Sequence, residues 1–399
     1  MNVLHDFLKK RLKYLNLIFN KYTNFDEKTF ISLQPKGKSK GIALISYIAE
    51  PFFLKNGQSI PNGHTHFWES LEMANVFLRN GFSVDVISYR NSIFIPQEKY
   101  TYFIGARTNF ERIAKQLNKD CIKIAHMDMS HWLYNNASAI TRCLELQQRK
   151  GVTVKSYKLQ EENRAVENAD FISILGNDFT AGTYQYSKKR IFKLPIPSCI
   201  TFPEPTEKDY EAVKKNYLWF GSRGLVHKGL DLVIEAFQEL PDYHLTICGP
   251  VNNDKDPDFE KLFHKELYET ANIHTVGWVD VESQKFKNIV NNCVGIIYPS
   301  SAEGGGGCVI TAMHAGLIPI VSYQASVDVD DSFGIMLKSN SVEAIKEEII
   351  AISERSHGKL REMSSKAWQV ARDRYTRQHY SIQFERMIHE TIADIKNKG

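Results

Sequence analysis

The sequence lacks the signatures of several enzyme classes. It contains no Walker-type P-loop, no HExxH and no paired CxxC, motifs that serve phosphate binding, a catalytic zinc and a structural metal or redox site, respectively. A single G-x-S-x-G match, GKSKG at residues 37–41, lies in a basic linker that leads into the first predicted strand, and not at the strand-to-helix turn that exposes a nucleophilic serine. Metal-dependent and serine-nucleophile mechanisms therefore have no support in the sequence, and we expect neither a metal site nor a bound cofactor.

Cysteine is also scarce, with six residues in a chain of 399. They are scattered, at Cys121, Cys143, Cys199, Cys248, Cys293 and Cys308. This spacing is typical of reduced, small apolar side chains in a cytoplasmic protein rather than of a disulfide framework or a zinc site.

Long apolar runs are missing as well. No stretch approaches the ~18 consecutive apolar residues that a membrane-spanning helix needs. The first apolar residues are interrupted by Lys9, Lys10, Arg11 and Lys13, so we expect no signal peptide. We therefore predict a cytoplasmic protein.

One stretch near the start, residues 7–22, carries Leu8, Leu12, Leu15, Phe19 and Tyr22 on one helical face. Because lysines and asparagines lie mostly opposite, this helix suits either an anionic membrane surface or a packed position against the body or a partner. We favour packing, since apolar stripes usually face a core. Peripheral contact with a membrane through residues 7–22 stays open.

Charge of one sign is not in large excess. The net charge is +4, and the first 40 residues alone hold nine lysines and arginines against three acidic residues. The body is therefore slightly acidic and offers no strong field for nucleic acid, so we expect no nucleic-acid partner.

What the chain does contain is an alternation of apolar strands and amphipathic helices. A strand at 41–48 is followed by a helix at 66–81 and a strand at 82–89, and further short apolar runs lie between helical stretches. Residues 194–206 hold four prolines, which is typical of a joint between domains. The alternation then resumes and predicts an α/β fold with doubly wound parallel sheets in two domains.

In the second half, strands are expected at 217–222, 243–249 and 318–323, and helices at 343–372 and 377–397 close the chain. The predicted organisation is a basic N-terminal extension (1–40), a first domain (41–205), a second domain (206–375) and a C-terminal helix (376–399). This last helix either stays with the second domain or crosses back to pack on the first.

A run of four glycines marks the first candidate site. In YPSSAEGGGGCVITAMHAGLIPIVS, Glu303 and Gly304–Gly307 lie between an apolar strand and a helix. Such a loop exposes backbone N–H groups at a positive helix end and lets an anionic or sugar ligand approach the main chain. The alternative is a strained structural turn with a solvated glutamate.

A second candidate lies in FGSRGLVHKGLDL, where Arg223 and Lys228 bracket the start of a helix. Two cations at this end oppose the helix dipole, which indicates a bound anion such as a diphosphate. The alternative is a solvated basic turn.

Two loops of the first half are weaker candidates. Gly63 precedes the first long helix, where its backbone would approach a phosphate or an acceptor; His64 and His66 lack the partners of a metal site. His126 and Asp128 end a strand, and His126 is either an active residue or an ordinary buried one.

Taken in order, FGSRGLVHKGLDLVIEAF, HLTICGP, HTVGWV and the four-glycine segment resemble the nucleotide-binding half of retaining glycosyltransferases of family 4. NGHTHFWESLEMANVFLRNGFSVDVISY resembles that family's first loop and helix, so the resemblance runs from about residue 41 to 385. It implies the GT-B architecture, two Rossmann-like domains facing across a cleft that holds the site, with the first on the acceptor side and the second binding the nucleotide sugar. It also implies metal-independent transfer of a sugar, with retained configuration, from a nucleotide-diphosphate sugar to a hydroxyl of a glycan, lipid-linked or other acceptor in polysaccharide or glycoconjugate synthesis.

Site residues follow from the same resemblance. Arg223 and Lys228 match the family's R-x4-K pair, which neutralises the donor diphosphate. Glu303 matches the first glutamate of E-x7-E, which touches donor-sugar hydroxyls, and the four glycines, Gly304, Gly305, Gly306 and Gly307, would give N–H groups to sugar and phosphate. Further donor contacts are implied for Gly221, Val276, Trp278, Gly63 and His126.

One position departs from the family. The second glutamate, which holds the nucleotide ribose, is replaced by Thr311. A hydroxyl makes fewer hydrogen bonds than a carboxylate, so the ribose contact and the nucleotide are open. Two alternatives therefore remain: a non-catalytic nucleotide-sugar-binding or scaffold protein of the same fold, and a nucleotide-sugar epimerase.

Overall fold

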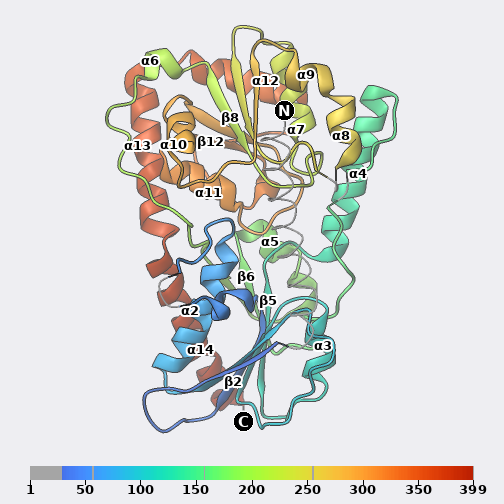
Figure 1. Ribbon diagram of the computed structural model, residues 1–399, viewed down its shortest axis with the longest axis vertical. Coiled ribbons are helices and arrows are strands. Elements are labelled where there is room, and N and C mark those ends of the chain that lie inside the picture. Colours follow the sequence, from blue (N-terminus) through green and yellow to red (C-terminus); the bar gives the residue numbers. More distant parts are fainter. Residues whose placement is uncertain (1–28, 56–57, 157, 254–255, 399) are drawn as a thin grey trace, which may run out of the picture. The chain divides into compact units, whose positions relative to one another are not determined.

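The computed structural model describes residues 29–398, apart from 56–57, 157 and 254–255 (Figure 1). The predicted helix at 7–22 lies outside these residues. The described residues form two compact units: the first holds 29–60 with 66–126 and 163–172, and the second holds 61–65, 127–162 and 173 onward. The domain boundaries expected from the sequence stay a prediction.

A seven-stranded sheet has the order β1-β3-β2-β4-β5-β6-β7. Its strands are β1 (Phe30–Leu33), β2 (Ile42–Tyr47), β3 (Ser83–Ser88), β4 (Tyr102–Gly105), β5 (Ile122–Met127), β6 (Phe171–Leu175) and β7 (Ile191–Leu194). Strands β3, β2, β4 and β5 run parallel, with Ala43 opposite both Val84 and Tyr102. The edge strand β1 was not predicted and is antiparallel to β3; it is short and half exposed, so its sequence lacks the apolar run of a central strand.

Helices lie between these strands, as the alternation predicts. They are α2 (Thr65–Arg79), α3 (Asn109–Ala114), α4 (Trp132–Lys150) and α5 (Asp178–Gly182). The longest of these, α4, has His131 as its N-cap, whose side chain accepts a hydrogen bond from the Leu133 N–H, and Gly151 in the left-handed conformation as its C-cap. Histidine and glycine at these two positions satisfy backbone groups that the helix itself leaves unpaired.

A six-stranded parallel sheet lies within the second unit, in the order β10-β9-β8-β11-β12-β13. Its strands are β8 (Asn216–Phe220), β9 (His244–Cys248), β10 (Ile273–Gly277), β11 (Gly295–Tyr298), β12 (Ile318–Val321) and β13 (Ile335–Met336). Its helices are α6 (Tyr210–Val213), α7 (Leu230–Gln238), α8 (Pro257–Leu262), α9 (His264–Tyr268), α10 (Gln284–Asn291), α11 (Gly307–His314), α12 (Val342–Ser353), α13 (His357–Arg374) and α14 (Arg377–Lys398). The predicted class, two doubly wound Rossmann-like sheets, is confirmed.

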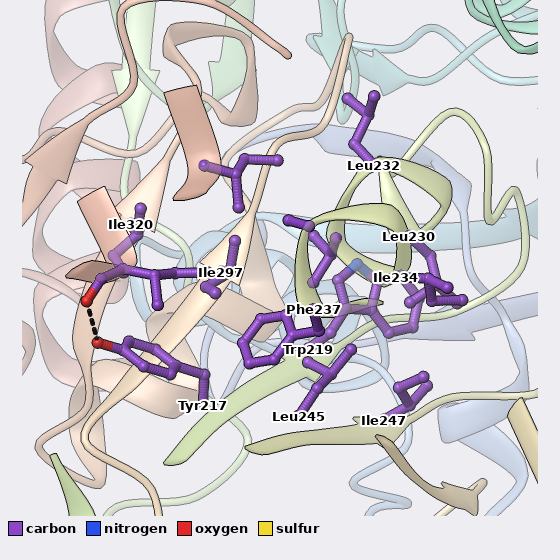
Figure 2. Packing of buried hydrophobic residues seen from close by; sticks show 14 of the residues in the cluster. Tyr217, Trp219, Leu230, Leu232, Ile234, Phe237, Leu245, Ile247, Ile297 and Ile320 are labelled. Carbon is purple, nitrogen blue, oxygen red and sulfur yellow. Dashed lines mark hydrogen bonds between the residues drawn. The ribbon is translucent and has the colours of Figure 1, made fainter. Parts of the chain in front are cut away.

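Large buried side chains hold the second unit together (Figure 2). Trp219 of β8 and Phe237 of α7 are fully buried in the same cluster. Tyr217 is also buried, and its hydroxyl donates to the Ile349 carbonyl of α12 at 3.0 Å, because a buried hydroxyl needs a partner. The Trp219 indole N–H donates to the Lys228 carbonyl at 3.4 Å, so this core supports the turn that carries Lys228.

The prediction of one helix over 343–372 is wrong. The segment contains α12 and α13, separated by Glu354–Ser356. The first helix ends with Glu354 as its C-cap, and Ser356 caps the start of the second, since its side chain accepts the Lys359 N–H at 3.3 Å. A serine in this position is a preferred N-cap.

Among the helices of the described residues, none combines the length and apolar content that crossing a membrane requires.

Candidate active site

Glu303 is the centre of a buried polar cluster in the second unit. It follows β11 and is 7% exposed. Its Oε1 atom accepts hydrogen bonds from the Ser300 hydroxyl at 2.9 Å, from the Tyr298 hydroxyl at 3.1 Å, and from the Lys228 ammonium group. Its Oε2 atom accepts a hydrogen bond from Lys158 Nζ at 3.1 Å. The carboxylate is therefore fixed by four donors from three segments of the chain.

Lys228 reaches this carboxylate from a tight turn ahead of α7. Its N–H donates to the Gly224 carbonyl at 2.9 Å. Gly229 has a φ of +73°, and a Cβ there would lie 2.5 Å from the Pro299 carbonyl oxygen. Only glycine suits this position, so the turn brings Lys228 against β11, where its Nζ lies 2.6 Å from the Tyr298 hydroxyl.

Lys158 is a member of the cluster that sequence reasoning missed. It lies 145 residues before Glu303 in an irregular segment after α4. Its carbonyl accepts a hydrogen bond from the Asn135 amide at 2.7 Å. It also packs closely against Gly224, where an added Cβ would lie only 2.8 Å from the Lys158 Cβ. No motif spacing pointed to it, because a single lysine in a polar stretch has no distinguishing pattern.

Asp256, also missed, holds the Lys158 segment and the Arg223–Lys228 turn together. It is fully buried at the start of α8. Its carboxylate accepts the Gly224 N–H at 2.9 Å, the Leu225 N–H at 3.3 Å and the Ser156 hydroxyl. These bonds satisfy a buried charge with neutral donors, and they fix two loops that each carry a lysine to Glu303.

The electrostatics leave this cluster with an excess of positive charge. Burial opposes ionisation of Glu303, but Lys158 and Lys228 hold its pKa well below the ordinary value. Burial likewise opposes the charge on Lys228, yet Glu303 raises its pKa. For Lys158, burial lowers the pKa to about 8. Burial and Lys158 lower the pKa of His227 to about 3, so His227 is neutral. Two cations thus face one carboxylate at neutral pH.

Beside the cluster lies a row of backbone donors. The helix α11 begins after Gly306, which adopts φ +52°. The N–H groups from Gly304 to Cys308 donate to no acceptor within the described chain; the Ile310 N–H bonds to the Gly306 carbonyl at 3.1 Å. Five N–H groups at a helix start form a ready site for an anion.

Most of the glycines are also required by the fold. A Cβ at Gly304 would lie 2.3 Å from the Asp128 carbonyl oxygen, and one at Gly305 would lie 2.6 Å from Ile196 Cγ1. Gly307 alone has space, with the nearest atom 3.8 Å away. The chain's own packing therefore explains Gly304 and Gly305, and close approach of a ligand is not needed to account for them.

Within the described part of the chain, no hydrogen bond or ion pair joins Arg223, Gly221 or Thr311 to this cluster. Arg223 is exposed, and no ion pair joins it to another residue of the described part. Gly221 donates its N–H to the Cys248 carbonyl at 3.0 Å. Thr311 is buried, and its hydroxyl donates to the Gly307 carbonyl at 2.9 Å, which commits its hydrogen to the helix backbone. Their roles toward a donor stay predictions.

The residues expected near the nucleotide base lie at the end of β10. Val276 is partly exposed, Gly277 adopts φ +78°, and the Trp278 side chain is 70% exposed. An exposed indole after a strand end is available for stacking on a flat ligand. Gly63 lies in an exposed turn of its own, with no atom within 4 Å of a built Cβ.

His126 belongs to a separate polar group in the first unit. It is 1% exposed, and its ring lies edge-on to Tyr47, with centroids 5.2 Å apart. The fully buried Glu69 accepts from the Tyr47 hydroxyl at 3.3 Å and lies 2.6 Å from His66 Nδ1. Among the described residues no group of three or more His, Cys, Asp and Glu side chains is placed to hold a metal ion.

Comparisons with known proteins found one family model and many solved structures that resemble this chain. A family model described as glycosyl transferases group 1 matches residues 204–370, which carry Arg223, Lys228 and Glu303. No curated protein sequence matches the chain.

Solved structures share the fold. Sucrose-phosphate synthase from Thermosynechococcus elongatus is 12% identical, with a TM-score of 0.58 over 88% of this chain and 99% of that one. Anabaena HepE in complex with UDP and glucose is 11% identical, with a TM-score of 0.51 over 89% and 100%. The pneumococcal O-GlcNAc transferase GtfA is 16% identical, with a TM-score of 0.48 over 73% of this chain, which spans only 57% of GtfA. The likeness to sucrose-phosphate synthase and HepE shows the GT-B fold, and together with the family match over residues 204–370 it supports a glycosyltransferase.

Proposed function

We propose that the protein is a retaining glycosyltransferase of family 4 that moves a sugar from a nucleotide-diphosphate donor to a hydroxyl acceptor without a metal ion. The observation that carries this proposal is the buried cluster of two lysines and one carboxylate beside five N–H groups without an acceptor. A buried excess of positive charge next to free donors is complementary to a phosphate anion. HepE, which shares the fold, has been solved with UDP and glucose.

The chemistry follows from where charge develops. As the sugar leaves, negative charge grows on the diphosphate, and fixed cations and N–H groups stabilise it without reorganising. Lys228 and the start of α11 would do this, with Arg223 joining from the exposed end of β8. The acceptor hydroxyl would attack from the leaving-group side and pass its proton to a diphosphate oxygen, so no protein nucleophile is needed.

Glu303 is suited to hold the donor sugar. Its Oε1 atom already accepts three hydrogen bonds, whereas Oε2 accepts one, from Lys158. An ionised carboxylate oxygen accepts two bonds readily. A sugar hydroxyl would therefore bind at Oε2, between Glu303 and Lys158.

The test is donor turnover with product analysis. Purified protein is incubated with UDP-, GDP- and ADP-sugars and a panel of glycan and lipid-linked acceptors, with and without EDTA. We expect acceptor-dependent release of nucleotide, unaffected by EDTA, and a product with the donor's anomeric configuration by NMR. Nucleotide-sugar conversion without an acceptor would favour an epimerase, and an inverted product would contradict retention.

A non-catalytic binding protein is the second candidate, because Thr311 stands where the family's ribose-binding glutamate is expected and commits its hydroxyl hydrogen to Gly307. Binding of a nucleotide sugar without turnover across the acceptor panel would support it. We place the enzyme in the cytoplasm, in polysaccharide or glycoconjugate synthesis, where turnover with a lipid-linked acceptor would also test contact with a membrane surface.

A further inference from the structure

Lys158 supplies the charge that makes the Glu303 cluster positive. Lys228 and Glu303 form an ion pair that is neutral by itself. Lys158 adds a second cation, with its Nζ atom 3.1 Å from the other carboxylate oxygen, Glu303 Oε2. The Lys158 side chain is 23% exposed. An anion that enters the cluster is therefore attracted by Lys158 rather than by the compensated pair.

The position of Lys158 is fixed by the surrounding chain. Its Cβ packs against Gly224, and the Asn135 amide donates to its carbonyl at 2.7 Å. Two residues earlier, Ser156 donates to Asp256, which also holds Gly224. Since the segment is anchored on both sides, the ammonium group is preorganised instead of being drawn from solvent.

We propose that Lys158 is a donor-binding residue, whose ammonium group contacts an anionic oxygen of the diphosphate while it aligns Glu303 Oε2 for the sugar. The assignment deepens the proposed function and rests on it. It predicts that the donor binds more weakly when Lys158 loses its charge.

Lys158 differs from the neighbouring titratable groups in the pH range over which its charge changes. The groups that face it or its partners are Glu303 on the loop before α11, Lys228 and His227 on the turn before α7, Tyr298 at the end of β11 and Cys308 at the start of α11. Glu303 is ionised, because its pKa is well below the ordinary value, and His227 is neutral. The pKa values of Lys228, Tyr298 and Cys308 are raised. Lys158, at about 8, is thus the first of them to change charge above neutrality.

The sign follows from this value. Below pH 8 Lys158 is charged and the donor binds with constant affinity. As the pH rises through 8, unbound protein loses the proton that the complex keeps, so Kd rises by up to about tenfold per pH unit. A bound diphosphate raises the pKa of Lys158, which is the linked half of the same effect.

The test is equilibrium binding by calorimetry of UDP-glucose, UDP-N-acetylglucosamine, GDP-mannose and ADP-glucose, from pH 6.5 to 9.5. For the nucleotide sugar that the wild type binds, Lys158→Gln should raise Kd about tenfold or more at pH 7 and should remove the dependence of Kd on pH. Lys158→Arg keeps its charge throughout and should bind without the rise above pH 8. Lys155→Gln removes a charge from an exposed neighbour and should behave as wild type.

The outcomes distinguish the two proposals. If the wild type binds none of the four nucleotide sugars, both proposals fail. If it binds one, but Lys158→Gln retains the affinity and the pH profile, the role of Lys158 is refuted and the proposed function stands. If Lys158→Gln does not fold, as judged by its melting temperature, Lys158→Arg decides: a wild-type rise in Kd above pH 8 would refute the assignment.

Discussion

Lys228 and Glu303 form a buried ion pair that joins the turn before α7 to the loop before α11, with side-chain exposures of 5% and 9%. The pair connects the two sequence motifs that are 75 residues apart. The pair stabilises the fold because each charge neutralises the other, and either charge alone would be buried without a partner.

Removing one partner should therefore destabilise the protein. Glu303→Gln leaves Lys228 charged and buried, and we expect a loss of about 3–5 kcal/mol in the free energy of unfolding. The double variant Lys228→Met/Glu303→Gln should lose clearly less than the sum of the single variants, measured by urea unfolding. Strictly additive losses would show that the pair is not coupled.

Acid should weaken the fold through His227. The ring bonds the Ala302 carbonyl at 2.7 Å through Nε2 and lies 3.1 Å from the Ser301 hydroxyl through Nδ1. Its pKa falls from 6.5 to about 3, mainly by burial and secondly through Lys158. The unfolded chain therefore binds a proton that the folded protein refuses, and stability is lost progressively as the pH falls from about 6.5 toward 3.

The measurement is the free energy of unfolding at pH 7, 6 and 5. Relative to pH 7, His227→Gln should lose less stability on acidification than the wild type, although it is less stable at pH 7. His389→Gln, at an exposed position of α14, is the matched control and should follow the wild type. Parallel pH profiles for the wild type and His227→Gln would contradict the assignment.

The glycine run can be dissected by alanine. Gly305 adopts φ +98°, and its Cβ would lie 2.6 Å from Ile196, whereas Gly307 has space. Gly305→Ala should cost about 1–3 kcal/mol of stability, and Gly307→Ala should leave the fold almost unchanged. Equal stability of both variants, measured by chemical unfolding, would show that the loop does not need its observed backbone.

Arg223 tests function apart from stability. Because the side chain is exposed and joins no ion pair in the described chain, Arg223→Ala should keep the wild-type melting temperature. If the guanidinium stabilises the leaving diphosphate, kcat/KM should fall by about a hundredfold or more. Lys338→Ala, an exposed lysine elsewhere in the second unit, is the control for loss of charge. An unchanged kcat/KM for Arg223→Ala would exclude the role.

Much of the fold was predictable from local pattern. The buried strands β2, β3 and β8 and the amphipathic helix α2 follow from apolar periodicity, since a parallel sheet covered on both faces needs continuous apolar runs. The edge strand β1 and the break at Ser356 were missed, because a half-exposed strand of four residues and a single capping serine carry weak local signals.

The site divides in the same way. Lys228 and Glu303 were found because each lies in a motif with recognisable spacing at the end of a strand. Lys158 and Asp256 were not, since their contacts with Glu303 and Gly224 join residues 145 and 32 positions apart and depend on the tertiary fold. Thr311 was noted as a departure, but only the structure shows that its hydroxyl bonds to Gly307.

The most direct test of the central claim, that the Glu303 cluster and the glycine-rich loop bind a nucleotide-diphosphate donor, is a thermal-shift screen against UDP, GDP, ADP, CMP and their sugar conjugates. A ligand that binds only the folded protein raises the melting temperature by mass action. We predict a rise with the conjugates of one nucleoside diphosphate, and its loss in Arg223→Ala and Lys158→Gln. A melting temperature that no nucleotide changes, or a rise that both variants retain, would contradict the account.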